Sequence, residues 1–148
     1  MYRSLDGGDT WVKRDGGGST FVNNFGGFVW YFGEMTVAPD NPDKLYSLGQ
    51  GLIRSTDGGV LWTSILGGAH VDEHALWIDP SNPFRIYLGG DGGFFSTIAG
   101  GGSWQKSLDL PITQFYAGHL DASNPNRLVG GTQDNFCLLY TSPSPRDS

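Results

Sequence analysis

Cysteine is almost absent from this sequence of 148 residues, and Cys137 is its single example. One cysteine cannot form a disulfide within the chain, so a disulfide framework is excluded and cysteine usage says nothing about the compartment. Charged residues make up only 16% of the chain. No stretch shows the 3.6-residue period of an amphipathic helix, and no apolar run reaches the length of a transmembrane helix. These absences disfavour a helical domain and a membrane-spanning helix within these residues.

Positive charge is also scarce, since nine basic residues face fifteen acidic ones and the formal net charge is −6. A surface of this sign repels nucleic acid and anionic membranes, so neither is expected as a partner. What the chain does contain is glycine, 24 residues, and aromatic side chains, 14%. This composition is typical of many short strands joined by tight turns and predicts an all-β fold. No cofactor is expected.

An Asn-Pro pair occurs three times at a nearly constant period. Asn41, Asn82 and Asn124 each precede a proline and lie 41 and 42 residues apart. In the first two copies a serine follows 13 positions after the proline, at Ser55 and Ser96. Each pair predicts a tight turn between two strands, with the proline presetting φ. A period of this length is typical of a β-propeller or a solenoid.

A second repeated motif follows the pattern Ser-x-Asp-x-Gly-x-Thr-Trp. Residues 4–11 fit it at every fixed position, and residues 55–62 depart only at Leu61. This is the Asp-box, a hairpin turn in which the aspartate accepts backbone N–H groups, glycines adopt positive φ and the tryptophan packs between sheets. The residues predicted to have this structural role are Ser4, Asp6, Gly8, Trp11, Ser55, Asp57, Gly59 and Trp62. In a third copy, residues 96–104, an extra residue is present and the aspartate is missing, so that turn must be held differently.

Longer segments carry a family resemblance. Residues 70–80, 89–93, 110–116 and 130–135, together with the Asp-boxes, resemble the bacterial Asp-box (BNR-repeat) propellers of the sortilin-like and glycosyl-hydrolase-like branch, which includes xyloglucanase relatives. The resemblance covers residues 1–136. It implies a multi-bladed β-propeller with four-stranded antiparallel blades, often secreted, and hence an extracellular or periplasmic location. It does not imply activity, because the branch mixes enzymes with binding proteins.

The repeat also predicts how the chain is organised. Residues 1–136 are expected to form part of a propeller: the end of one blade, two blades and the start of another. Residues 14–27 are expected to be a long inter-blade loop, which can carry function. Residues 137–148 resemble the translation of a sequencing adapter, and the alternative is an ordinary Pro/Ser-rich tail. They are therefore excluded from the functional argument, and the chain is interpreted as a fragment.

Propeller topology predicts two different faces. In a blade whose four strands run outward from the axis, successive connections alternate between faces, so the Asn-Pro turns and the Asp-boxes share one face. The opposite face is expected to bind the ligand. It receives the loop through His70, Asp72 and His74 and the loops that carry Gln50, Asp91, Gln133, Asp134 and Asn135.

The spacing of His70, Asp72 and His74 allows three interpretations. In an extended segment these side chains share one side and Glu73 lies on the other. Two imidazoles and a carboxylate could hold a divalent metal. Alternatively, the carboxylate fixes the tautomer of a ligand-binding histidine, or the three form a polar network that ties adjacent blades together.

Two functions from different classes remain open. The first is a binding or scaffold propeller that presents this face to a protein, peptide or glycan. The second is a xyloglucanase-like glycoside hydrolase, for which Asp72, Asp91 and Asp134 are the candidate catalytic carboxylates, with Glu73 also on that face. Trp30, Tyr31 and Trp77 could stack on sugars, although an aromatic residue in a propeller strand more often belongs to the core. A photosystem-assembly-type propeller, which shares Asp-box-like repeats, is a third interpretation.

Overall fold

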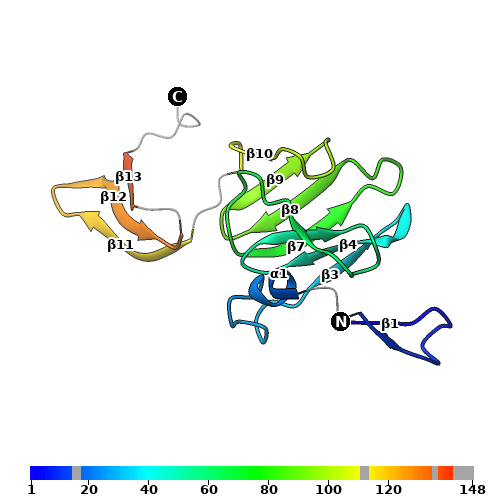
Figure 1. Ribbon diagram of the computed structural model, residues 1–148. Coiled ribbons are helices and arrows are strands. Elements are labelled where there is room, and N and C mark those ends of the chain that lie inside the picture. Colours follow the sequence, from blue (N-terminus) through cyan, green and yellow to red (C-terminus); the bar gives the residue numbers. More distant parts are fainter. Residues whose placement is uncertain (15–17, 111–113, 135–136, 142–148) are drawn as a thin grey trace. The chain divides into compact units, whose positions relative to one another are not determined.

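The computed structural model describes residues 1–14, 18–110, 114–134 and 137–141. The chain forms two compact units, Met1–Leu108 and Asp109–Ser148. Both are built from antiparallel strands, with one short helix in the first unit (Figure 1). The predicted all-β fold class is thus confirmed. No helix among the described residues is long and apolar enough to cross a membrane.

The first unit contains two four-stranded sheets and one hairpin. In both sheets the strands are hydrogen-bonded in chain order, which is the up-and-down order of a propeller blade. The first sheet comprises β3 (Met35–Ala38), β4 (Asn41–Leu48), β5 (Leu52–Ser55) and β6 (Thr63–Ser64), and the second comprises β7 (Glu73–Ile78), β8 (Ile86–Gly90), β9 (Gly93–Thr97) and β10 (Gln105–Lys106). The hairpin consists of β1 (Tyr2–Arg3) and β2 (Val12–Lys13).

The second unit is a three-stranded antiparallel sheet of β11 (Phe115–Asp121), β12 (Asn124–Thr132) and β13 (Cys137–Thr141). Its first two strands repeat the register of β7 and β8: Phe115 pairs with Thr132 as Glu73 pairs with Gly90, and one residue bulges out after each. Strand β13 lies within the segment that resembles an adapter. Backbone pairing does not depend on the origin of a segment, so that interpretation stays a prediction, and residues 142–148 lie outside the described part.

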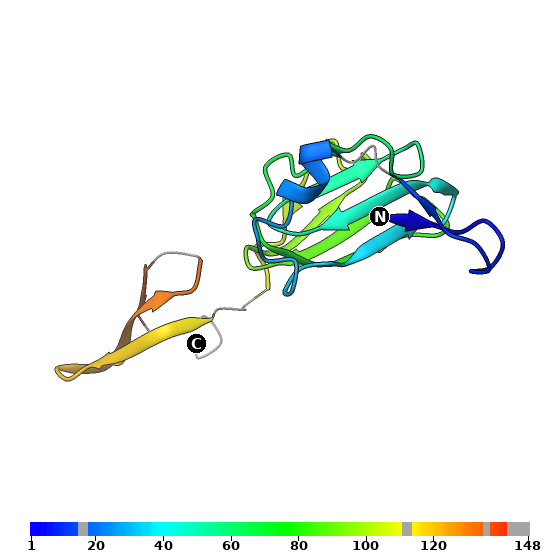
Figure 2. The same ribbon diagram turned by 60° about the horizontal axis from the view of Figure 1, so that its bottom comes forward.

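The main core lies between the two four-stranded sheets, which pack against each other (Figures 1 and 2). Alternation of side chains along β7 shows why: Leu76 and Ile78 are buried, while Trp77 between them is exposed. The buried cluster joins side chains of both sheets: Ala38, Tyr46, Leu48, Leu52, Leu76, Ile78, Ile86, Leu88 and Phe95.

The two turns that match the serine-aspartate pattern have the predicted geometry. In the second, the N–H of Gly59 donates to Ser55 Oγ at 2.9 Å, and the N–H of Leu61 donates to the Asp57 carboxylate at 2.9 Å. Gly59 has a φ of 90°, and Trp62 donates from Nε1 to the carbonyl of Gly59. In residues 4–11 the N–H of Gly8 donates to Ser4 Oγ, the N–H of Thr10 donates to Asp6, and Trp11 Nε1 donates to the carbonyl of Gly8. Asp6 accepts hydrogen bonds from the hydroxyl and the N–H of Thr10 and from the Ser4 hydroxyl, and these donors lower its pKa to about 2.

The third turn is held differently, as predicted. Without an aspartate, residues 96–104 use the Thr97 hydroxyl, which accepts the N–H of Ala99 at 3.0 Å. Trp104 no longer bonds within its own turn, and its Nε1 donates to the carbonyl of Ile65 at 2.8 Å. This indole therefore connects the turn to the first sheet.

The Asn-Pro segments do connect the first and second strands, but the asparagine is not at the centre of the turn. Strands β4 and β12 begin at Asn41 and Asn124, which pair with Ala38 and Asp121. Each asparagine Oδ1 instead accepts the N–H two residues on, which is an Asx turn. The three bonds are Asp43 to Asn41 at 2.9 Å, Phe84 to Asn82 at 3.3 Å and Asn126 to Asn124 at 3.1 Å.

The expectation of an irregular loop over residues 14–27 is wrong in part. Helix α1 (Gly18–Asn23) forms there. Its Phe21 packs on Trp62, with ring centroids 5.0 Å apart, and meets Phe25 edge-on. Six residues are too few for a helix to be stable alone, so this tertiary contact accounts for it.

Candidate functional site

The strand ends opposite the serine-aspartate turns of the first unit form a connected layer, here called the loop face and defined as residues 24–32, 49–51, 70–74 and 90–92. Backbone hydrogen bonds join its segments in series. Gln50 N donates to Asn24 O at 2.8 Å, Asp72 N to Gln50 O at 3.1 Å, and Asp91 N to Asp72 O at 3.0 Å. The structure therefore brings together Gln50, Asp72 and Asp91 of the predicted site.

The expected alternation of His70, Asp72 and His74 is wrong. Asp72 has a φ of 66° and precedes the strand, which begins at Glu73, so the segment is not extended there. His70 Nδ1 donates to the carbonyl of Val71 at 2.7 Å. Among the described residues no group of three histidine, cysteine, aspartate or glutamate side chains could hold a metal ion. The metal-binding interpretation therefore has no support in the described part of the chain.

His74, the last member of that motif, has a side-chain partner in Asp91. Its Nε2 lies 3.1 Å from Asp91 Oδ1, and both side chains are about one-third exposed. Phe32 stacks on the imidazole, with centroids 5.4 Å apart and planes 25° apart, while Tyr31 meets it edge-on at 5.3 Å. Fixed by one carboxylate and two rings, the imidazole presents a defined orientation to the surface.

Exposed aromatic rings continue from this histidine. Trp30 lies 5.6 Å from Tyr31, centroid to centroid. Their exposed fractions are 81% and 61%, so most of both rings faces solvent. Trp77, the third aromatic candidate, is elsewhere: it stacks on Tyr87, which stacks on Phe94, across β7, β8 and β9. Trp77 thus belongs to a ladder on the sheet, and only Trp30 and Tyr31 belong to the loop face.

Glu73 is the most unusual group of the loop face. Its side chain is 1% exposed, and neither carboxyl oxygen has a hydrogen-bond partner among the described residues. Burial, followed by the negative charges of Asp72 and Asp91, raises its pKa from 4.5 to about 8. At neutral pH the carboxyl is therefore mostly protonated. It is inaccessible to a ligand, unlike the half-buried Asp91 next to it.

The other predicted site residues belong to the second unit. Gln133 N donates to Gln114 O at 2.9 Å, and Asp134 is exposed with a φ of 59°. Asn135 lies outside the described residues. Gln133 occupies the position in the second unit that corresponds to Asp91 by strand register, so an amide stands there in place of a carboxylate.

Two features of the site were not predicted. The burial of Glu73 could have been predicted from the repeat. The corresponding residues of the other two copies are Phe32 and Phe115, which indicate an apolar position. The contact of Phe32 and Tyr31 with His74 could not, because it depends on how the loop after α1 folds back.

No family model matches the sequence, and no curated protein does. Among solved structures, the chain is similar to the GH74 enzyme of Niastella koreensis (22% identity, TM-score 0.47) over 68% of this chain and 17% of that one. It is similar to the GH74 xyloglucanase of Xanthomonas campestris (20%, TM-score 0.46) over 70% and 18%. The third is YCF48 bound to D1 peptide (20%, TM-score 0.44), over 75% and 37%. The chain thus spans well under half the length of each of these structures.

Proposed function

We propose that the loop face binds a glycan through Trp30 and Tyr31. The main support for this proposal is that two adjacent aromatic rings are exposed to solvent beside the hydrogen-bonded pair of His74 and Asp91. Flat apolar rings offer stacking surfaces for the C–H faces of a sugar, and the imidazole and carboxylate offer hydrogen bonds to hydroxyls. Because Phe32 and Asp91 hold His74 in place, part of the ordering cost of binding is already met.

Truncating the exposed indole is the direct test. Trp30→Ala is expected to weaken binding of soluble β-glucan oligosaccharides by about tenfold to a hundredfold, the loss expected for a hot-spot aromatic residue. Isothermal titration calorimetry of the full chain measures it. Val29→Ala is the matched control, since Val29 is 62% exposed in the same loop but has no ring. Equal affinities of wild type and Trp30→Ala would contradict the proposal.

A reducing-sugar assay on the same oligosaccharides separates binding from catalysis. Asp72 and Asp91 lie on neighbouring loops joined by a backbone hydrogen bond, and this is what supports the hydrolase alternative. Release of reducing sugar, abolished in Asp91→Asn but not in Trp77→Phe, would replace the binding proposal with hydrolysis. Glucan binding without release of reducing sugar would support the binding proposal.

The proposal places the chain among the Asp-box propellers and outside the cytoplasm. The paired hydrogen bonds at Ser4, Asp6, Ser55 and Asp57 support the former. The location is proposed from the family resemblance alone. A protein or peptide ligand remains the alternative at the same face, and competition between peptide and glucan would show which one it prefers.

A further inference from the structure

Two junctions of the first unit are built on the same plan, on the side away from the loop face. In one, the β1–β2 hairpin meets the first sheet; in the other, the first sheet meets the second. In each, a turn glycine donates its N–H to the carbonyl of the residue two after an Asn-Pro asparagine: Gly58 to Asp43 at 2.8 Å and Gly100 to Phe84 at 2.9 Å. An arginine precedes the serine of each preceding turn, Arg3 and Arg54. The residues of the two junctions therefore correspond one to one.

The junction between the two sheets is filled by apolar side chains. Arg54 Nη1 donates to the carbonyl of Gly100 at 3.0 Å. The rest of the space around the turn is occupied by Phe84, which faces Gly100, and Ile65, which faces Gly101. One arginine and two apolar side chains thus surround the turn glycines at this junction.

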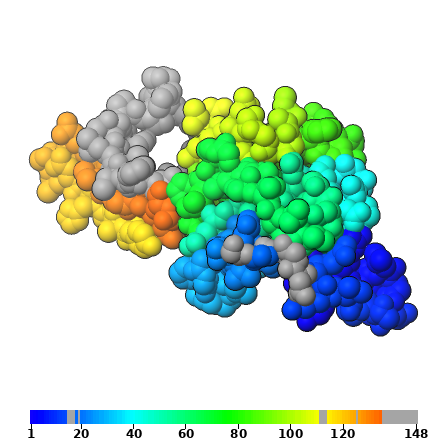
Figure 3. Space-filling view, viewed as in Figure 1, coloured from blue at the N-terminus to red at the C-terminus, as the bar shows by residue number. Residues whose placement is uncertain are grey.

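The hairpin junction carries charge at both of those apolar positions. Arg14 corresponds to Ile65, and Asp43 corresponds to Phe84. Arg14 Nε donates to the carbonyl of Gly58 at 3.2 Å, and Arg3 Nη1 forms an ion pair with Asp43. The hairpin stands beside the first sheet (Figure 3). An open space lies at this junction.

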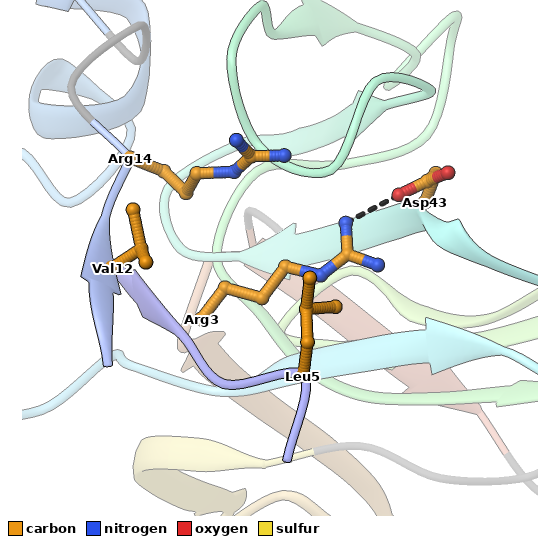
Figure 4. A pocket seen from close by; sticks show the side chains of 5 residues that line it. All are labelled: Arg3, Leu5, Val12, Arg14 and Asp43. Carbon is orange, nitrogen blue, oxygen red and sulfur yellow. Dashed lines mark hydrogen bonds and ion pairs between the residues drawn. The ribbon is translucent and has the colours of Figure 1, made fainter. Parts of the chain in front are cut away.

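This open space is a cleft of about 350 Å³ lined by Arg3, Leu5, Val12, Arg14 and Asp43 (Figure 4). Both arginine side chains extend from the hairpin towards the side of Asp43. Two guanidinium groups and one carboxylate leave a local charge of +1 in a chain whose net charge is −6. Among the described residues Arg14 has no ion-pair partner.

We propose that this cleft binds an oxyanion: a carboxylate, sulfate or phosphate group whose oxygens accept hydrogen bonds from Arg14 and Arg3. Planar guanidinium groups match the oxygens of these anions in pairs. Leu5 and Val12, which are 85% and 60% exposed, supply an apolar wall for the organic part of such a ligand. The site is separate from the loop face and does not depend on the function proposed there.

The experiment titrates the full chain with inorganic phosphate, sulfate and propionate at constant ionic strength, set with sodium chloride. Binding is followed by the arginine Nε–Hε resonances in NMR spectra. Saturable shifts of Arg3 and Arg14 with at least one oxyanion, and none with chloride, are expected. Arg14→Ile, which installs the residue of the other junction, is expected to weaken binding about tenfold to a hundredfold, the loss of a charge-assisted contact.

Two further variants keep the test decisive. Arg14→Lys retains the positive charge but lacks the planar guanidinium group, so its affinity for the anion should lie between those of wild type and Arg14→Ile. This variant tests the proposal even if Arg14→Ile fails to fold. Arg85→Ala removes one positive charge from the ion pair with Asp79, outside the cleft, and should bind like wild type. Absence of saturable binding, or equal weakening in Arg85→Ala, would overturn the proposal.

Discussion

Replacing Glu73 with leucine is expected to stabilise the protein, by about 1–3 kcal/mol at pH 5 and by about 5–7 kcal/mol at pH 8. The smaller gain comes from removing a buried polar group whose oxygens have no hydrogen-bond partner. The larger gain adds the free energy of keeping the carboxyl protonated in the folded state at a pH where the unfolded state has released that proton. Urea unfolding followed by tryptophan fluorescence at several pH values measures both.

The direction of the pH dependence follows from where the proton is held. The unfolded carboxyl titrates near 4.5 and the folded one near 8. Between these values the folded state keeps a proton that the unfolded state has released, so the stability of the wild type falls as pH rises through this window. The aspartates of the turns have lowered pKa values and lose their contribution only in more acidic solution. Glu73 is therefore expected to dominate the slope above pH 5.

The chain offers a matched control, because its other glutamate, Glu34, is exposed. Glu34→Leu removes the same atoms without relieving burial, so its stability should follow the wild-type pH profile. A wild-type slope that persists in Glu73→Leu would show that the carboxyl is not the group responsible. The apolar residues at the corresponding repeat positions, Phe32 and Phe115, indicate that the backbone accepts a side chain without a charge there.

The regular half of each four-stranded sheet was predictable because its signals are local. Ser55 and Asp57 bond to backbone groups within four residues, so their spacing in the sequence already determines the turn. The strand order follows from the repeat. The turns and the strand order both depend on hydrogen bonds between residues close in sequence. Because the same pattern occurs in several copies, each copy supports the same prediction.

The loop face was predictable in position but not in detail. Topology placed Gln50, Asp72 and Asp91 at the same end of the sheets, and backbone hydrogen bonds join them there. The bulge after Glu73 and the positive φ of Asp72 altered which side chains converge. The same bulge follows Phe115 in the second unit, and the backbone of Asp72 is held by hydrogen bonds to Gln50 and Asp91, which are distant in sequence.

Glycine at position 90 is expected to be indispensable to this arrangement. A Cβ there would collide with the Glu73 carboxyl and with the carbonyl oxygen of Asp72. That carbonyl accepts the N–H of Asp91, so Gly90→Ala should move the loop that carries the proposed ligand contacts. A loss of about 1–3 kcal/mol in the free energy of unfolding is expected from this overpacking, together with weaker glucan binding. Denaturation and calorimetry measure the two effects.

The adjacent glycine provides the control and separates two causes. A Cβ at Gly89 would meet only the Ala75 methyl, at 3.9 Å, so Gly89→Ala should change stability by no more than about 1 kcal/mol. Adding Gly90→Ala to the Glu73→Leu variant distinguishes a crowded side chain from a crowded backbone. If the carboxyl alone were the obstacle, the second substitution would cost little. Because the Asp72 carbonyl is part of the main chain and cannot rotate away, we expect most of the loss to persist.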